Sequence, residues 1–360
     1  MKRAFDERCR KLKKQLELSD LDGLLVTKRA NWYYLTGFTG DSAALIVSRR
    51  GITLITDGRF TVQARQETSG IRILLQKKGL YEDLGEVLKR QGLRRIGFDP
   101  LQMSVAQWRV ARKASRGGGR WVGAPGLVEA QRMIKERGEL AAMRQAALLA
   151  GGVLEQVLRR IKPGVRETEI GAEIEYQMRK KGASGASFDS IVASGARSAL
   201  PHAHPTAKQL RKNELVVLDL GVILHNYCSD ITRTVYLGQV PQRIRKWYQA
   251  VQEAQQAALS TIKAGVSCGE VDAAARQVLA NYGLDRYFVH STGHGLGLEV
   301  HEEPRVARGQ KRKLEAGNVI TIEPGVYVAG VGGIRIEDDV LVTATGSEVL
   351  TRVTRDLIEL

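Results

Sequence analysis

Carboxylates in β-rich runs and a cluster of histidines are the residues of this chain whose types and positions could do chemistry. The acids are Asp219 in LDLG, Asp230 in SDITRT, Glu323 in TIEPG and Glu337 in GIRIEDD, and three histidines lie in HSTGHGLGLEVHEEP, residues 290–304. Acidic side chains are disfavoured in strands, so each of these carboxylates calls for a reason. Carboxylate oxygens with one imidazole suit Mn²⁺, Co²⁺ or Zn²⁺. We therefore interpret the set as a carboxylate-rich site for two divalent metal ions.

The first pair of acids lies on one predicted hairpin, ELVVLDLGVILHNYCSDITRTVYLG. If His225 and Asn226 form its two-residue turn, Asp219 lies opposite Thr232, and Asp230 lies diagonally across on the same face. Side chains alternate with a period of two along a strand, so any turn of even length gives the same result. Two bare carboxylates among apolar neighbours repel each other, and a bound cation would relieve that repulsion.

The second pair of acids lies in VITIEPGVYVAGVGGIRIEDDVLVT. Glu323 ends a β-branched strand and precedes a Pro-Gly turn signal. Glu337 is predicted within a single strand, GIRIEDDVLV, where alternation places Arg335 and Glu337 on the same face. This pair would complete the ligand set that the two aspartates begin.

The elements that must position these residues form two predicted domains. Residues 1–125 predict a small α/β domain, residues 126–135 a linker and residues 136–360 the larger domain that carries the site. In the first domain, short apolar strands alternate with helices predicted near 1–20, 60–68, 81–90 and 104–115. Glycine-rich stretches at 117–119 and 123–126 indicate that the linker is near.

An internal repeat organises the larger domain. IKPGVRETEI at 161–170 recurs as IKAGVSCGEV at 262–271, and each copy follows one long helical pattern and precedes another. The simplest account is a duplicated helix-helix-strand unit. A site between two such halves would take ligands from both.

These motifs resemble those of the pita-bread metallopeptidases, specifically the Xaa-Pro aminopeptidase and prolidase branch, over essentially the whole chain. The resemblance implies an α/β (α+β) fold, in which a creatinase/prolidase-like N-terminal domain precedes duplicated units around a curved antiparallel sheet. It implies that Asp219, Asp230, His294, Glu323 and Glu337 bind two divalent metal ions, most simply Mn²⁺, with Asp230 and Glu337 bridging both. All five residues are present, which argues against a relative that has lost its metals, such as the creatine amidinohydrolases.

The same resemblance implies residues on the substrate side of the metals. His202, in SALPHAHPT, would contact the substrate or carry a proton, and His290 and His301 would lie near the scissile carbonyl. Between them, Gly293, Gly295 and Gly297 make a helical zinc pair of His290 and His294 improbable.

Two further side chains complete the expected catalytic set. Glu323 would accept the proton of the attacking water as well as bind metal, and Arg335 would pair with the acids beside the metals or with substrate. His204 and His225 match no functional position, and we interpret them as loop and turn residues.

The implied reaction is hydrolysis of the Xaa-Pro bond at the N-terminus of peptides, because two metal ions lower the pKa of water so that a hydroxide shared between them attacks near neutral pH. The alternative within the class is an Xaa-Pro dipeptidase. A non-catalytic binding module on the same fold is the rival from another class. The resemblance also implies a homodimer.

Charge distribution and the absence of certain motifs argue against several other functions. The formal net charge of +16 is concentrated in residues 1–130, where 25 Lys and Arg face 13 Asp and Glu. These basic residues are scattered rather than interleaved with aromatics, so nucleic-acid binding is not expected. There is no GxGxxG, P-loop or GxSxG motif, and no long apolar run, so a nucleotide site, a serine nucleophile and a membrane span are not expected either. Three isolated cysteines favour a cytoplasmic protein.

Overall fold

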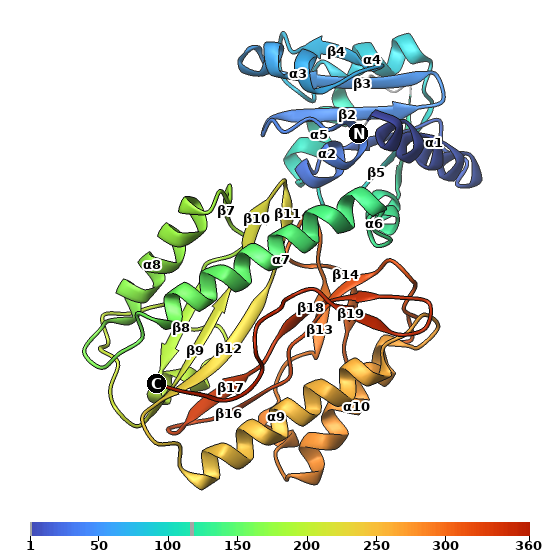
Figure 1. The fold of residues 1–360 in the computed structure, drawn as a ribbon. Helices are drawn as coiled ribbons and strands as arrows, with labels where there is room; N and C mark the ends of the chain where they lie inside the picture. Colours follow the sequence, from blue (N-terminus) through green and yellow to red (C-terminus); the bar gives the residue numbers. More distant parts are fainter. Residues whose placement is uncertain (1, 116–118) are drawn as a thin grey trace. The chain divides into compact units, whose positions relative to one another are not determined.

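The chain divides into two compact units, Met1–Arg132 and Met133–Leu360, in a computed structural model that describes residues 2–115 and 119–360 (Figure 1). The division falls inside the predicted linker of 126–135, but this segment is not simply extended, since Leu127–Arg132 forms helix α6. Of the glycine-rich stretches predicted to lie near the linker, Gly117 and Gly118 fall outside the described residues. Gly123, from the second stretch, is the last residue of strand β6 (Arg120–Gly123) in the first sheet.

The N-terminal unit is built on one six-stranded sheet in the order β4-β3-β2-β1-β5-β6. Antiparallel pairing joins β1, β2 and β3, whereas the pairs β3–β4, β1–β5 and β5–β6 are parallel. The strands are β1 (Gly23–Val26), β2 (Ala43–Ser48), β3 (Gly51–Thr56), β4 (Arg72–Leu75) and β5 (Arg95–Phe98), with β6 at the edge. The predicted α/β character of this unit is confirmed.

Helices connect these strands at the predicted places. They are α1 (Lys2–Leu18), α3 (Thr61–Glu67), α4 (Leu84–Gln91) and α5 (Val105–Ala114), and the sequence did not reveal α2 (Arg29–Thr36), β6 or α6. The start of α5 shows why these boundaries form where they do. Ser104 caps the helix in a capping box with Gln107, which satisfies backbone donors that the first turn leaves unpaired.

The C-terminal unit begins with a helix pair, α7 (Arg137–Leu158) and α8 (Glu167–Lys180), packed on antiparallel strands. The strands are β7 (Gly185–Ala186), β8 (Ile191–Ser194), β9 (Glu214–Leu220), β10 (Val222–Leu224), β11 (Tyr227–Cys228) and β12 (Ile231–Leu237). The apolar face of α7 repeats at helical spacing, through Met143, Ala146, Ala147, Ala150, Val153, Leu154 and Val157. Most of this face packs against β9, β10 and β12 in the core of this half, whereas Met143 and Ala147 belong to a separate cluster with Tyr227.

A second helix pair, α9 (Gln242–Thr261) and α10 (Cys268–Asn281), covers the other strands, and Figure 1 shows the strands lying between the two pairs. These strands are β13 (Gly293–Gly295), β14 (Glu302–Val306), β15 (Val319–Ile322), β16 (Gly325–Val328), β17 (Gly332–Arg335), β18 (Asp338–Val342) and β19 (Ser347–Val349). The chain ends in β20 (Ile358–Glu359), which pairs with β12 in parallel. All other strand pairs of this unit are antiparallel.

The predicted duplication is confirmed at the level of single hydrogen bonds. Gly164 and Gly265 hold nearly the same left-handed backbone, with φ of 91° and 92°. Their N–H groups donate to the carbonyls of Leu210 and Leu314, at 2.9 and 2.8 Å. At the start of each following helix, α8 and α10, a glutamate side chain, Glu169 or Glu270, accepts the backbone N–H of the residue three positions before it, at 2.7 and 2.8 Å. The two halves therefore use the same local backbone conformation and hydrogen bonds in the turn between their two helices.

Short 3₁₀ turns occur at Gly58–Phe60, Gly195–Ala199 and Asp285–Tyr287. None of the helices described is both long enough and apolar enough to cross a bilayer.

Candidate metal centre

The hairpin that carries the two aspartates folds as the sequence predicted. His225 and Asn226 have positive φ of 52° and 68°, as a two-residue hairpin turn requires. The register that pairs Leu224 with Tyr227 continues along the strands and pairs Asp219 with Thr232. Asp219 and Asp230 both lie in the buried interior, where two ionised carboxylates repel each other.

The two glutamates stand opposite each other at a gap in the second hairpin. Ile322 pairs with Asp338 and Gly325 pairs with Arg335, so one register continues across the gap and places Glu323 opposite Glu337. The prediction of a single strand through GIRIEDDVLV is therefore wrong. That segment is two strands, β17 and β18, which belong to different sheets. The Pro-Gly signal marks the same break on the other strand, between β15 and β16, and not a reversal of the chain.

The break exists because both glutamates give their backbone N–H groups to other parts of the unit. The N–H of Glu323 donates to the carbonyl of Thr292 at 2.8 Å, and that of Glu337 donates to the carbonyl of Thr232 at 3.1 Å. The hydroxyl of Thr232 donates to Glu337 Oε2 at 2.6 Å and accepts from Arg335 Nε at 3.1 Å. Arg335 and Glu337 thus meet at one hydroxyl, and their predicted common face is confirmed.

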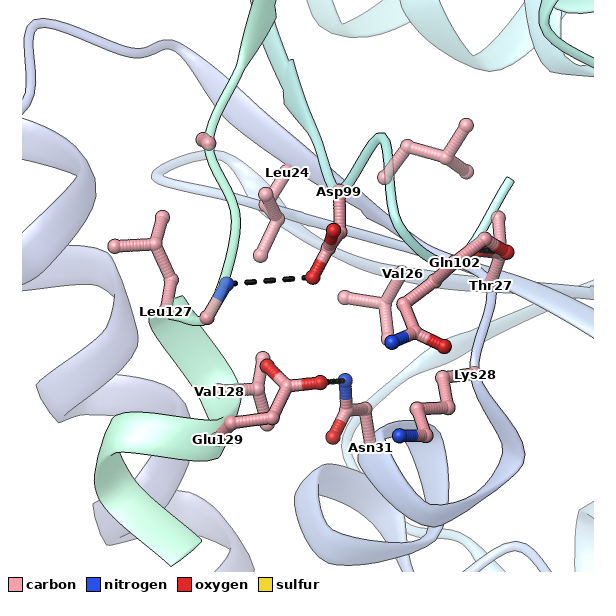
Figure 2. A pocket seen from close by; sticks show the side chains of 13 residues that line it. Leu24, Val26, Thr27, Lys28, Asn31, Asp99, Gln102, Leu127, Val128 and Glu129 are labelled. Atoms are coloured by element: carbon pink, nitrogen blue, oxygen red, sulfur yellow. Dashed lines mark hydrogen bonds between the residues drawn. The ribbon is translucent and has the colours of Figure 1, made fainter. Parts of the chain in front are cut away.

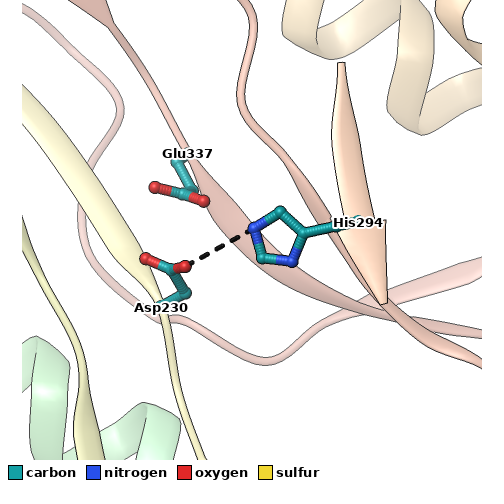
Figure 3. Close-up of side chains that lie close together, drawn as sticks. All are labelled: Asp230, His294 and Glu337. Carbon is teal, nitrogen blue, oxygen red and sulfur yellow. Dashed lines mark ion pairs between the residues drawn. The ribbon is translucent and has the colours of Figure 1, made fainter. Parts of the chain in front are cut away.

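His294 brings an imidazole to the same carboxylates. Its Nε2 lies 3.7 Å from Asp230 Oδ2 and 3.6 Å from Glu323 Oε1. Figure 3 shows Asp230, His294 and Glu337 converging from three different segments, with ligand atoms within 4.8 Å of one another. The Nδ1 of His294 lies 3.0 Å from the carbonyl of Gly295, so Nδ1 carries the proton and the lone pair of Nε2 faces the acids.

Glycines on both sides of His294 allow this approach. A Cβ at Gly293 would lie 1.9 Å from the carbonyl oxygen of Thr321, and one at Gly295 would lie 2.3 Å from that of Glu303. The glycines therefore let β13 fit between its neighbouring strands, which fixes where the imidazole points. The segment is a strand and not a helix, as the glycines indicated.

Burial and mutual repulsion make the acids resist ionisation in the metal-free protein. Burial, followed by the charges of Glu337 and Asp219, raises the pKa of Asp230 well above its usual range. The pKa of Glu337 is raised in the same way, by burial and by the charges of Glu323 and Asp219. Burial raises the pKa of Glu323 to about 8. For His294 burial acts in the opposite sense, lowering its pKa to about 4 and keeping the ring neutral.

These residues fit a pair of divalent metal ions. Asp219 Oδ1 and Asp230 Oδ1 are buried and have no hydrogen-bond partner among the described residues, although buried carboxylate oxygens are normally satisfied. A neutral imidazole and four carboxylates are the donors that a hard or borderline cation stabilises. The arrangement could therefore hold metal through Asp219, Asp230, His294, Glu323 and Glu337.

A chain of hydrogen bonds extends from Asp219 to His290. Arg335 donates through Nη2 to Asp219 Oδ2 and through Nη1 to the Tyr327 hydroxyl, the latter at 2.7 Å. The Tyr327 hydroxyl lies 2.9 Å from His290 Nε2. Since Arg335 can only donate, the hydroxyl proton of Tyr327 is directed to His290. Burial first, and the charge of Arg335 second, lower the pKa of His290 to about 4.

The other predicted histidines lie at different distances from the metal ligands. The ring of His301 is 4.4 Å from that of His294, centroid to centroid. His202 is exposed, and its charge contributes to lowering the pKa values of both His290 and His301. The carbonyl of Pro201 accepts from Arg335 at 3.3 Å, which ties this segment to the site.

The two histidines to which the sequence assigned no role lie in a loop and a turn, as expected. His204 is contacted through its carbonyl, which accepts from Arg197 Nη2 at 2.6 Å. His225 is the first residue of the hairpin turn.

The sequence did not reveal three polar residues that support this centre, namely Thr232, Tyr327 and Asp339. Asp339 is buried and accepts the backbone N–H of Asp230 at 3.1 Å, which fixes that segment of chain. Tyr327 could have been found from strand parity, because it lies four residues after Glu323 and so on the same face. It pairs with Gly333, where a Cβ would lie 2.7 Å from the tyrosine ring.

A small pocket in the N-terminal unit does not compete with this centre. It lies beside β1, and Figure 2 shows Asp99 accepting from the backbone of Gly126, and Glu129 accepting from Asn31. Its volume is about 10 Å³, which is room for about one water molecule.

Comparison with known proteins identifies both units. Residues 141–344 match the sequence profile of Metallopeptidase family M24, and residues 8–134 match that of the Creatinase/Prolidase N-terminal domain. The chain is 35% identical to the Xaa-Pro dipeptidase of Pyrococcus horikoshii, over 98% of this chain and 99% of that protein.

Solved structures give the same similarity. The Xaa-Pro dipeptidase from Bacillus anthracis has a TM-score of 0.96 and 37% identity, covering 99% of this chain and 100% of that chain. The X-Pro aminopeptidase from Thermotoga maritima has a TM-score of 0.89 and 36% identity, covering 96% of this chain and 100% of that chain. The fold expected from the motifs is therefore confirmed.

Proposed function

The chain belongs to metallopeptidase family M24, and we propose that it hydrolyses the peptide bond that precedes a proline, with two divalent metal ions at the centre described above. The observation that carries this proposal is the convergence of three buried carboxylates, the half-buried carboxylate of Glu323 and one neutral imidazole. Two of the carboxylate oxygens lack a hydrogen-bond partner among the described residues. We propose Mn²⁺ as the natural metal, with Co²⁺ and Zn²⁺ as alternatives.

Asp219, Asp230, His294, Glu323 and Glu337 would hold the two ions. When bound, the ions supply Lewis acidity, which activates water and stabilises developing negative charge. Arg335 keeps Asp219 oriented through its direct ion pair. Thr232 orients Glu337, which sets the direction of the carboxylate lone pairs.

The remaining steps belong to side chains of this chain. Glu323 accepts the proton of the attacking water. His301 and His202 stabilise the oxyanion or deliver a proton to the departing proline nitrogen, which has no N–H and leaves only when protonated. His290, held by Tyr327, contacts the substrate near the scissile carbonyl.

The names of similar proteins support our choice of substrate class. Both the Pyrococcus horikoshii relative and the Bacillus anthracis structure are called Xaa-Pro dipeptidases, so we propose Xaa-Pro dipeptides as the preferred substrates. The Thermotoga maritima structure is called an X-Pro aminopeptidase, which supports removal of the first residue from longer Xaa-Pro peptides as the second candidate. The motifs alone had suggested the opposite order. We also propose a homodimer, which light scattering after size-exclusion chromatography would test.

One parallel assay tests the proposed function. The protein, stripped of metal and reloaded with Mn²⁺, Co²⁺ or Zn²⁺, is given an Xaa-Pro dipeptide, an Xaa-Pro-Yaa tripeptide and a Met-Ala peptide. We expect the dipeptide to give the highest kcat/KM and the Met-Ala peptide to give no turnover. A higher kcat/KM for the tripeptide would establish the second candidate instead. A protein that binds no metal and cleaves none of the peptides would be a binding module.

A further inference from the structure

Helix α10 carries a buried ion pair directed at the loop that precedes His294. Asp272 is 1% exposed and accepts from Arg276 Nε at 2.7 Å, one helical turn further along. The same carboxylate accepts from the backbone N–H and the hydroxyl of Thr292, at 3.3 and 2.8 Å. The carbonyl of Thr292 in turn accepts the backbone N–H of Glu323 at 2.8 Å. Asp272 therefore ties the loop to the helix and, through it, to a predicted metal ligand.

Arg276 holds the other end of this loop by its backbone. Its Nη1 donates to the carbonyl of Phe288 at 3.1 Å, and its Nη2 donates to the carbonyl of His290 at 2.6 Å. The guanidinium carbon also lies 4.3 Å from the centroid of the Phe288 ring. The loop thus bends around one planar cation, which donates from Nε and from both terminal nitrogens and also stacks on the Phe288 ring.

This arrangement decides which side chain of the loop faces the site. With the carbonyls of Phe288 and His290 both directed at Arg276, Val289 is turned outwards and is 67% exposed. The His290 ring is turned inwards, where it lies edge-on to Phe288 at 5.1 Å between centroids. Its Nε2 reaches Tyr327, and its Nδ1 lies 3.9 Å from Glu323 Oε2.

The first half of the unit holds its own histidine loop in a related way. Glu167 on α8 is buried and accepts from the backbone N–H and the hydroxyl of Ser194, at 2.9 and 2.8 Å. It also accepts from Arg197 Nε at 3.1 Å, and Arg197 donates to the carbonyl of His204. A carboxylate on the second helix of each half, paired with an arginine, therefore fixes a loop that carries a predicted substrate-side histidine.

We propose that Arg276, oriented by Asp272, is a positioning residue that holds His290 in the direction needed for substrate. The proposal rests on the proposed function, because it takes the role of His290 from it. An ordinary helix ion pair between residues four apart would serve only local stability and would leave both loop carbonyls to other donors. Here the guanidinium donates to both of those carbonyls, from Nη1 and Nη2.

The variant Arg276→Lys tests this role, because an ammonium keeps the charge but cannot contact Asp272 and two carbonyls with the geometry of a planar fork. We expect kcat for the dipeptide to fall roughly 10- to 100-fold, since a displacement of about 1 Å can cost that much. KM should change by less than about threefold, and the Mn²⁺ content should equal that of the wild type. Arg245→Lys is the matched control, because Arg245 forms an exposed ion pair with Glu359.

Two further measurements separate positioning from folding and from the proposed function. Arg276→Ala should regain kcat when guanidinium is added at millimolar concentration, and urea at the same concentration should restore nothing. Crystal structures of the wild type and of Arg276→Lys should show His290 displaced from Tyr327 in the variant, a result that requires no activity. The inference is overturned if His290 keeps its place, or if kcat falls only in proportion to lost metal. Absence of turnover in the wild type would count against the proposed function alone.

Discussion

The two halves of the C-terminal unit share a scaffold but supply different chemistry. Each begins with two helices joined at a left-handed glycine, Gly164 or Gly265, and each continues into an antiparallel hairpin. In both halves the hairpin passes from one sheet into another at the acids. In the first half the gap lies between the β9–β12 and β10–β11 ladders, where one register places Gly221 opposite Asp230. In the second half the residues opposite each other at the gap are Glu323 and Glu337, both acidic.

The difference teaches that duplication supplied the frame and the break, and that different residues at the break supplied the site. At each break a backbone N–H bonds to the other half: that of Glu337 donates to Thr232, and that of Asp230 donates to Asp339. The two halves therefore hold each other at the point where the acids meet, and neither half holds a complete ligand set.

Removal of one predicted ligand from either half is the most severe test of this comparison. Asp230→Ala and His294→Ala should each lower metal-dependent kcat/KM by at least about 10³-fold, because the metals provide the nucleophile and the charge stabilisation. Bound metal, measured by mass spectrometry of the elements, should fall in both variants. The control His204→Ala should match the wild type. If only one of the two variants lost metal, one half would suffice as a site.

The substrate-side histidines of the two halves should serve catalysis without binding metal. His202→Ala and His301→Ala should keep the full metal content and lower kcat by roughly 10²- to 10⁴-fold, the usual range for a lost general acid or base. Steady-state kinetics with the dipeptide and metal analysis of the same samples give both quantities. Loss of metal in His301→Ala would show that it is a ligand and not a substrate-side residue.

Thr232 of the first half contacts Glu337 and Arg335 of the second half through its hydroxyl. Removing that hydroxyl tests how much this contact contributes to metal binding. Thr232→Val keeps the shape of the side chain but removes the contacts to Glu337 and Arg335, and Mn²⁺ affinity should weaken roughly 10- to 100-fold. Titration calorimetry measures the affinity. Thr261→Val is the control, since the Thr261 hydroxyl bonds only within helix α9. Equal affinities in the two variants would remove Thr232 from the site.

The raised carboxylate pKa values predict how the metal-free protein responds to pH. His290 and His294 oppose the effect of the acids on stability, mainly below about pH 6.5, because folding lowers their pKa values from 6.5 to about 4. Between pH 6.5 and 8 this opposing effect fades and the acids dominate, since the pKa of Glu323 is raised to about 8. The folded state then binds more protons than the unfolded state, so the free energy of unfolding falls as pH rises.

Thermal unfolding after chelation checks this prediction. The Tm of the metal-free protein should fall from pH 6.5 to 8, and the gain in Tm on adding Mn²⁺ should grow over the same interval. A gain that is constant with pH would mean that the acids are already ionised without metal.

The two glycine turns give the smallest expected effect and the closest match between halves. Gly164→Ala and Gly265→Ala should each lower the free energy of unfolding by about 1–2 kcal/mol, since a Cβ disfavours the left-handed backbone although nothing lies within 4 Å of it. Denaturant titration measures both. Gly346→Ala, where φ is not in that region, is the control. Unequal losses at Gly164 and Gly265 would show that the two turns are not equivalent.

Sequence patterns located most of the elements because alternation and helical spacing are local properties. The first five strands of the N-terminal sheet and the turn at His225-Asn226 follow from them directly. The break at Ile336 and Glu337 could not be predicted, because GIRIEDDVLV has the alternation of one strand and only the partner strands force it into two sheets. Helix α2 was not predicted for a related reason. The aromatic residues of RANWYYLT favour a strand, and tertiary packing makes the segment helical instead.

The sequence by itself determined the donor types, the parity that groups Asp219 with Asp230 and Arg335 with Glu337, and the duplicated turns. These depend on residue identity and on the fixed periods of strands and helices. Only the tertiary structure decided that Glu323 faces Glu337 across an opened ladder, that Tyr327 connects Arg335 to His290, and that Arg276 turns His290 inwards. These contacts join segments distant in sequence, and no local pattern encodes which backbone group a strand leaves unpaired.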